Sequence, residues 1–222
     1  MNELKHLAVV MDGNRRWARK NGLLEKIGYS QGAKVVEKII EVCIDEKIQN
    51  LTLYAFSTEN WQRPKEEVEF LFKLLNKYLD ESLNKFIANE VRFKAIGNLS
   101  LLDESTLKKI QNFQGQTKNH TKLCVNLAIS YGSKDEIVRA VKKVIERNLE
   151  INEANIQANL DLSEDVDLFL RVGSAKRISN FLLWQSSYAE IYFSQTLFPA
   201  LTKKEIANII TEFKKRKRTF GK

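Results

Sequence analysis

Short apolar segments alternate along this chain with longer segments in which apolar residues recur every three or four positions. The short segments are rich in β-branched and aromatic residues, as buried strands are, and the longer ones have the spacing of amphipathic helices. Strands are predicted at residues 6–11, 51–56, 91–96, 123–129, 167–172 and 191–194. Helices are predicted at residues 30–48, 64–88, 100–118, 133–149, 152–160 and 202–218. The alternation predicts an α/β fold with a mostly parallel central sheet and helices on both of its faces.

One domain spanning residues 1–222 is expected, because no proline-rich or low-complexity linker divides the chain and its length suits one sizeable core. No apolar run approaches the ~20 residues that cross a bilayer. Cys43 and Cys124 lie in apolar segments without metal-like spacing, so we expect reduced thiols in a cytoplasmic protein. The net charge of +8 favours an anionic partner: nucleic acid, an anionic membrane surface or a phosphorylated small molecule.

Three polar clusters follow predicted strands. They read MDGNRRW at residues 11–17, STENWQRP at 57–64 and RVGSAKRIS at 171–179. Ligands of open α/β sheets bind beyond the carboxyl ends of the strands, so we expect the clusters to converge at one edge. Their arginines, with few obvious counter-charges, predict a site for more than one phosphate group.

Asp12 is suited to be a ligand of a magnesium ion within such a site. Mg²⁺ takes one or two carboxylates and fills the rest of its coordination shell with phosphate oxygens and water. Gly13 would let the backbone approach a diphosphate. The alternative is that Asp12 pairs with Arg15 or Arg16 at the surface. Neither a dinucleotide-binding glycine motif nor a P-loop is present, and with only two histidines a histidine-centred site is not indicated.

The predicted helix at residues 64–88 has an unusually wide apolar stripe. Packing against the core explains such a stripe. It is also explained if part of the helix lines a tunnel for a hydrocarbon chain, and the sequence leaves both readings open.

Three long segments carry a family resemblance: HLAVVMDGNRRWA from His6, LTLYAFSTENWQRP from Leu51 and RISNFLLWQSSYAEIYF from Arg177. In this order and separation they resemble the cis-prenyltransferases of the undecaprenyl diphosphate synthase type. The resemblance implies a homodimer with a parallel sheet and a hydrophobic tunnel. It also implies magnesium-dependent, repeated condensation of isopentenyl diphosphate onto an allylic diphosphate such as farnesyl diphosphate. The product would be a long-chain polyprenyl diphosphate, a lipid carrier precursor for cell-wall glycan, with peripheral membrane contact for its release.

The resemblance also assigns site residues. Asp12 is the essential carboxylate and a magnesium ligand, Asn60 handles a proton, and Glu190 is a second metal-binding carboxylate. The allylic diphosphate pocket comprises Gly13, Asn14, Arg15, Arg16 and Trp17. A mobile loop over the site comprises Ser57, Thr58, Glu59, Asn60, Trp61 and Arg63. The isopentenyl diphosphate site comprises Arg171, Arg177, Ile178 and Ser179. Aromatic packing for Trp17 and Trp61, and a surface acid for Glu190, are the alternatives.

The chain departs from the family pattern in several places. Glu25 and Tyr29 stand where the family usually has arginine and histidine, and Lys26 is a candidate to restore the lost charge. Ala175 replaces a usual glutamate, and Thr219 a usual arginine.

Two rival functions remain. The basic tail KKRKR at residues 214–218 suits a nucleic-acid-binding module, but no RNA-binding signature accompanies it and we expect no nucleic-acid partner. The other rival is a non-catalytic partner subunit of the same fold, which Glu25 and Ala175 favour and Asp12, Asn60 and Arg177 oppose.

Overall fold

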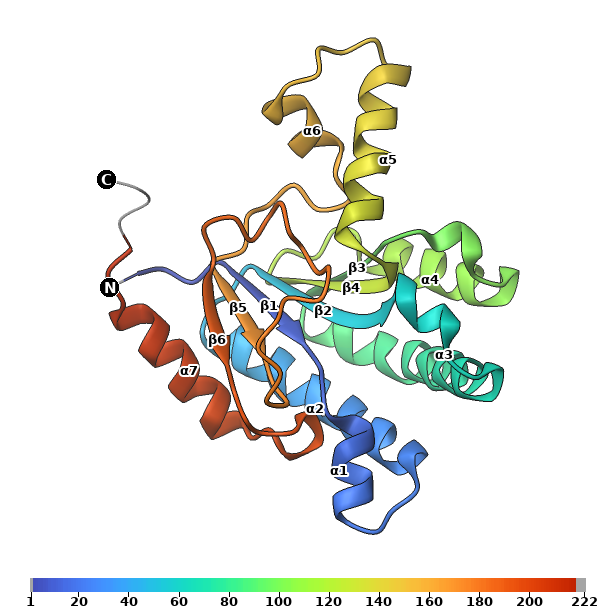
Figure 1. Cartoon of the computed structure of the whole chain (residues 1–222), viewed down its shortest axis with the longest axis vertical. Coiled ribbons are helices and arrows are strands. Elements are labelled where there is room, and N and C mark those ends of the chain that lie inside the picture. Colours follow the sequence, from blue (N-terminus) through green and yellow to red (C-terminus); the bar gives the residue numbers. More distant parts are fainter. Residues whose placement is uncertain (1, 219–222) are drawn as a thin grey trace.

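A wholly parallel six-stranded sheet forms the centre of the computed structural model, which describes residues 2–218. Its strands are β1 His6–Val10, β2 Asn50–Ser57, β3 Val91–Ile96, β4 Leu123–Tyr131, β5 Leu168–Arg171 and β6 Glu190–Phe193. The strand order is β3-β4-β2-β1-β5-β6, and every neighbouring pair is parallel. All six predicted strands are confirmed, with ends that differ by one or two residues (Figure 1).

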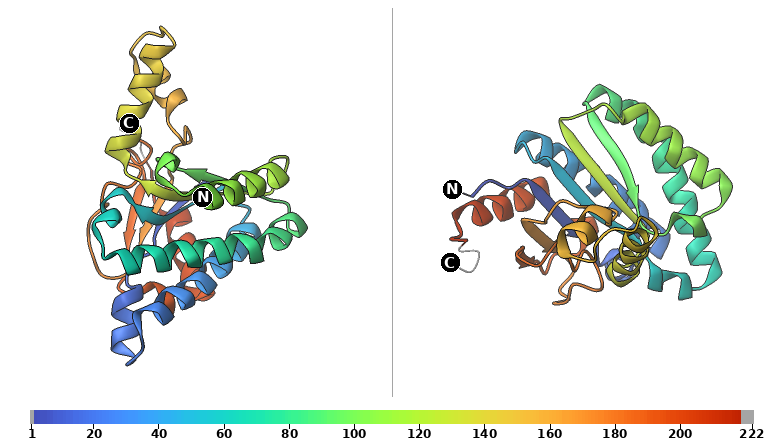
Figure 2. Two further views of the ribbon diagram at one scale, coloured as in Figure 1. Left: turned by 90° about the vertical axis from the view of Figure 1, so that its right-hand side faces the viewer. Right: turned by 90° about the horizontal axis from the view of Figure 1, so that it is seen from above.

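Helices flank the sheet unevenly. They are α1 Asn14–Lys20, α2 Glu25–Asp45, α3 Lys65–Ala88, α4 Glu104–Thr117, α5 Ser133–Glu146, α6 Glu153–Asn159 and α7 Lys203–Lys215. Short 3₁₀ turns are η1 Thr58–Gln62, η2 Leu99–Leu101 and η3 Phe198–Ala200. The larger core cluster joins one face of the sheet to α2, α3, α4 and α7. The opposite face packs largely against the segment 160–189, while α5 and α6 extend away from the sheet (Figure 2).

Burial on both faces explains why the central strand reads as a continuous apolar run. Leu7 and Val9 of β1 belong to the helix-covered core, whereas Ala8 and Val10 belong to the cluster on the other face. Side chains alternate between the faces of a strand, so a strand covered on both sides needs apolar residues at successive positions.

Two helix starts differ from the prediction, for reasons that lie in capping. The second helix begins at Glu25 rather than residue 30, because Ser30 is not a cap: its hydroxyl donates to the carbonyl oxygen of Lys26 within the helix. The fourth begins at Glu104 rather than residue 100, because Asp103 caps it by accepting a hydrogen bond from the Thr106 amide at 2.9 Å. Between residues 2 and 218, no helix combines the length and apolarity needed to cross a membrane.

Candidate active site

The three polar clusters converge at the carboxyl edge of the sheet, as predicted. Strand β1, which leads to Asp12, lies between β2 and β5, which lead to the other two clusters. At Gly13 the chain takes a positive φ of 107° and enters α1. At Gly173, φ is 91° and a Cβ atom would lie 2.7 Å from the Asp12 carbonyl oxygen and 2.8 Å from Arg16 Nη2. Glycine at position 173 therefore lets the fifth-strand loop pack directly on the first.

The Asp12 carboxylate links two arginines from different clusters. Its Oδ1 accepts from Arg16 Nη2 at 3.0 Å, and its Oδ2 accepts from Arg171 Nη2 at 2.9 Å. The Arg171 side chain is only 5% exposed, whereas that of Asp12 is 28% exposed. The pairing of Asp12 with Arg16 matches one alternative left open by the sequence, and Arg171 is a partner that sequence reasoning did not propose.

Three further arginines of this edge, Arg15, Arg19 and Arg63, are also paired with carboxylates. Arg15 Nε contacts Glu25 Oε2 at 2.7 Å, and its Nη1 lies 3.6 Å from Glu67 Oε2. Glu25 also accepts from Arg19 Nη2 at 2.6 Å, and Glu67 accepts from Arg63 Nη1 at 3.1 Å. Burial opposes the charge of Glu25, but the hydrogen bonds from Arg19 and Arg15 outweigh it and lower the pKa of Glu25. The expectation of few counter-charges is therefore wrong.

Tyr29 joins this group as a neutral hydrogen-bonding residue. Its hydroxyl donates to Glu67 Oε1 at 2.8 Å and accepts from Arg63 Nη1 at 3.1 Å. Burial and the hydrogen bond to Glu67 raise the pKa of Tyr29 to about 12. Tyr29 therefore stays protonated at neutral pH and holds Glu67 and Arg63 together.

Arg171 also shapes the segment that bears Arg177. Its Nη1 donates to the Arg177 carbonyl oxygen at 2.6 Å and to Ser179 Oγ at 2.7 Å. The Arg177 guanidinium itself has no carboxylate partner among residues 2–218. The edge thus presents an unneutralised positive charge beside Ser179.

The loop after β2 is held by its own cap and by the neighbouring loop. Ser57 and Asn60 form a capping box, in which Asn60 Oδ1 accepts from the Ser57 amide at 3.2 Å. Glu59 Oε1 accepts from Asn180 Nδ2 at 3.1 Å. This loop and the segment 177–180 are therefore in direct contact at the site.

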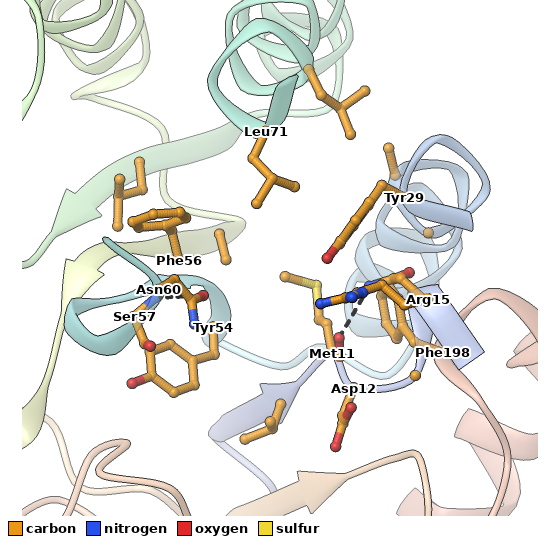
Figure 3. Close-up of a pocket in the computed structure, with 18 of the residues that line it drawn as sticks. Met11, Asp12, Arg15, Tyr29, Tyr54, Phe56, Ser57, Asn60, Leu71 and Phe198 are labelled. Carbon is orange, nitrogen blue, oxygen red and sulfur yellow. Dashed lines mark hydrogen bonds between the residues drawn. The ribbon is translucent and has the colours of Figure 1, made fainter. Parts of the chain in front are cut away.

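A cavity of about 970 Å³ lies beneath these polar groups. Figure 3 shows Asp12 and Arg15 on one side of it, Ser57 and Asn60 across from them, and Leu71 of α3 above. The apolar lining comprises Val10, Met11, Ala33, Val36, Ala55, Phe56, Leu71, Phe72, Leu74, Leu75, Leu127, Ile129 and Phe198. On α3, Leu71 and Leu75 line the cavity, whereas Leu79 and Phe86 are buried in the core. The long helix therefore packs in the core along one part and lines the cavity along another; that the cavity takes a hydrocarbon chain stays a prediction.

Known proteins are similar to this chain over most or all of its length. The family model described as "Putative undecaprenyl diphosphate synthase" matches residues 10–221. An isoprenyl transferase from Campylobacter jejuni is 64% identical over 222 residues, which cover all of both chains. The chain belongs to the undecaprenyl diphosphate synthase family.

Comparison with solved structures supports this family assignment. The crystal structure of "a probable undecaprenyl diphosphate synthase" from Campylobacter jejuni is similar over the full length of both chains, with 60% identity and a TM-score of 0.90. Lavandulyl diphosphate synthase from Lavandula x intermedia, solved in complex with dimethylallyl diphosphate, is 29% identical over 99% of each chain, with a TM-score of 0.94. The chain is therefore a prenyl transferase of the undecaprenyl diphosphate synthase family.

Most, but not all, of the residues assigned from the family resemblance line the cavity. Those that do are Asp12, Gly13, Asn14, Arg15, Arg16, Ser57, Glu59, Asn60, Arg63, Arg171, Arg177 and Ser179. Those that do not are Trp17, Thr58, Trp61, Ile178 and Glu190. The Trp61 indole donates to Ser130 Oγ at 2.9 Å and stacks on Phe72 with centroids 5.3 Å apart, which is the aromatic packing weighed as its alternative. The roles assigned to all of these residues, inside and outside the cavity lining, stay predictions.

Glu190 lies far from Asp12 within one chain. It opens β6, in register with Leu168 and through it with Leu7 of β1. Asp12 follows five residues after Leu7, which corresponds to roughly 16 Å along the strands. Glu190 Oε2 instead accepts from Arg216 Nη1 at 2.8 Å. A single chain therefore does not bring the two family carboxylates to one metal ion.

The departures from the family pattern have structural counterparts. Lys26 does not line the cavity, and its ammonium lies 5.5 Å from the ring centroid of Phe70. Glu25 instead holds Arg15 and Arg19, two arginines that do line it. Ala175 offers no polar side chain at this edge, and Thr219 lies outside the described residues.

Sequence reasoning missed two lining residues, Tyr54 and Asn180, and also Glu67, which pairs with the lining residues Arg15 and Arg63. Glu67 lies four residues after Arg63, which precedes α3, so the pair is close in the sequence although the two residues do not share a helix. Tyr54 donates to the carbonyl oxygens of Tyr131 and Ser179, and no sequence pattern predicts such long-range contacts.

Proposed function

We propose that the chain condenses isopentenyl diphosphate repeatedly onto an allylic diphosphate of the farnesyl type, forming a new cis double bond in each cycle. The product would be a long-chain polyprenyl diphosphate of undecaprenyl length, which serves as the lipid carrier precursor for cell-wall glycan. One observation carries this proposal: a rim of arginines opens directly into an apolar cavity of about 970 Å³. Such a site suits a molecule with a diphosphate head and a hydrocarbon tail.

The allylic diphosphate is assigned to the first cluster. Arg15 and Arg16 would bind its oxygens in the bidentate manner of guanidiniums, with backbone amides after Gly13 as further donors. The known binding of dimethylallyl diphosphate by the Lavandula enzyme, a structural neighbour, supports an allylic diphosphate as ligand. The tail would extend along Leu71 and Leu75 of α3.

Isopentenyl diphosphate is assigned to Arg177 and Ser179, beside the buried Arg171. In each cycle the allylic carbon–oxygen bond breaks and diphosphate leaves with the electron pair. The isopentenyl double bond forms the new carbon–carbon bond, and a proton is lost from the resulting cation. Arginines that face the leaving diphosphate stabilise its developing charge. Asn60 lines the cavity and is the assigned residue for the proton.

Asp12 fits a magnesium ion shared with a diphosphate. Each of its oxygens accepts one hydrogen bond, although a carboxylate has about four acceptor positions, and the side chain borders the cavity. Between residues 2 and 218, no cluster of three or more acidic, histidine or cysteine side chains forms a metal site by itself. Asp12 with phosphate oxygens and water is the ligand set that Mg²⁺ prefers. The bound ion would neutralise charge on the departing diphosphate.

The decisive experiment measures incorporation of labelled isopentenyl diphosphate by the purified protein, with chromatographic sizing of the products. We expect long polyprenyl diphosphates with farnesyl diphosphate as primer, and incorporation only when Mg²⁺ is added. Sedimentation of the same preparation tests the proposed homodimer. Absence of incorporation across short and long allylic primers would contradict the proposal and would favour the non-catalytic partner subunit.

A further inference from the structure

An apolar corner projects from the molecule where α1 turns into α2. Leu23, Leu24 and Ile27 are all exposed there, and the Leu24 side chain most of all, at 74%. Figure 1 shows this corner at the opposite extremity of the molecule from α5 and α6. Three large exposed apolar side chains within five residues mark a contact surface rather than the scattered single exposures that are normal.

Leu24 occupies a position where leucine gives the fold no benefit. It is the N-cap of α2, with extended backbone angles and no side-chain hydrogen bond to the helix. Serine, aspartate or asparagine would satisfy a free helix amide at that position, whereas leucine satisfies none. An exposed leucine at a helix N-cap gives neither a capping hydrogen bond nor packing, so its presence there points to a function.

The surroundings of the corner are strongly basic. Residues 13–34 contain six basic side chains and one acid, Glu25, which is a net charge of +5 out of +8 for the whole chain. Lys20, Lys26 and Lys34 are exposed, and within the described part of the chain they form no ion pair. The corner therefore combines apolar side chains with unneutralised positive charge, which is the composition of membrane-surface elements.

We propose that this corner docks on an anionic lipid bilayer. Leu23, Leu24 and Ile27 enter the headgroup region, and Lys20 and Lys34 contact lipid phosphates. The charge selects a lipid surface over a protein partner, because Lys20, Lys26 and Lys34 pair with no carboxylate of the described residues and surround an apolar tip too small for a stable protein interface. Arg15 and Arg19 of the same helix line the cavity, so docking would place the cavity mouth beside the bilayer.

The proposed function supplies the reason for such docking, because the product is a lipid that must leave the cavity for a membrane. The test needs no substrate, however. The full chain is mixed with vesicles of phosphatidylcholine alone or with phosphatidylglycerol, and co-sedimentation is measured. We expect binding mainly to the anionic vesicles, about ten-fold weaker binding for Leu24→Ser, and about five-fold weaker binding for Lys20→Gln.

Two features make Leu24→Ser a sharp test. Serine is a better N-cap than leucine, so the melting temperature should stay constant or rise, and lost binding cannot be ascribed to unfolding. Ile151→Ser is the matched control, because Ile151 is 61% exposed but lies on the distant α5–α6 arm, and this variant should bind vesicles like the wild type.

Incorporation of isopentenyl diphosphate in vesicle-free solution should be unchanged in Leu24→Ser, so failure of docking and failure of catalysis are seen separately. Equal binding to neutral and anionic vesicles, or wild-type binding by Leu24→Ser, would overturn the proposal. So would a change in oligomeric state of Leu24→Ser without vesicles, since the corner would then contact a second copy of the chain.

Discussion

Replacing Asp12 with asparagine tests the centre of the site most directly. Asparagine keeps the shape of the side chain and one acceptor oxygen but removes the negative charge. That oxygen can serve only one of the two arginines, Arg16 and Arg171, which Asp12 contacts at 3.0 and 2.9 Å. The amide nitrogen then faces the other guanidinium, which is donor against donor.

The expected magnitude follows from the burial of the two partners. Removing one partner of a fully buried ion pair costs about 3–5 kcal/mol. Here only Arg171 is buried, Asp12 is 28% exposed, and asparagine retains one hydrogen bond, so we expect a loss of about 1–2 kcal/mol in the free energy of unfolding. Turnover should fall by at least about 100-fold, or about 2.7 kcal/mol in activation free energy, because a key electrostatic group is lost.

The assay pairs initial rates of isopentenyl diphosphate incorporation with urea unfolding. Asp135→Asn is the matched control, because Asp135 contacts Arg139 Nε at 2.8 Å on α5, away from the cavity. That variant should lose a comparable or smaller amount of stability and retain its turnover. An Asp12→Asn enzyme within a few-fold of the wild-type rate would refute the assignment of Asp12, whatever its stability.

Further predictions concern the cavity, the second diphosphate position and pH. Leu75→Trp should shorten the products, because the indole would fill part of the cavity, while Ile87→Trp on the exposed end of the same helix should leave chromatographic product length unchanged. Arg177→Gln should raise the KM for isopentenyl diphosphate about ten-fold, as expected for the loss of a charged hydrogen bond. The same variant should leave the urea midpoint almost unchanged, because no carboxylate among the described residues pairs with Arg177. Burial lowers the pKa of His6, so the folded state binds its proton less readily than the unfolded state, and stability should fall as the pH drops below about 6.5. Urea unfolding of His6→Gln across that range should show a shallower pH dependence; an unchanged slope would assign the effect to other groups.

The central strand β1 was predictable because burial on both faces leaves an apolar run in the sequence. Ala8 and Leu7 face opposite sides of the sheet, yet both are buried, so the run from Leu7 to Val10 is apolar at every position. The first helix and the true start of α2 were missed because Gly13 and Leu24 offer no side-chain cap. Local capping signals predict only those helix ends that use them.

The arginines of the site were predictable, but their partners were not. Asp12 meets Arg171 because β1 and β5 are neighbours in the sheet, and neighbour relations between strands are a property of the tertiary fold. Glu25 meets Arg15 because α1 folds back along α2 through a turn that the sequence did not predict. Only Glu67 lies close in the sequence to its arginine, four residues after Arg63, and even there Arg63 precedes the helix that bears Glu67.

For Glu190, the role implied by the family motif conflicts with the place of the residue in the fold. The other polar residues assigned to the site follow the strands β1, β2 and β5, and in a parallel sheet these positions share one edge. Glu190 opens a strand instead of following one, so strand direction alone places it at the opposite edge. The predicted strand at residues 191–194 already implied this conflict with a metal site shared with Asp12. A second metal-binding role for Glu190 would therefore require a diphosphate or metal ion at that far edge, and Glu190→Gln should leave the magnesium dependence of a single-chain site at Asp12 unchanged when rates are titrated against Mg²⁺.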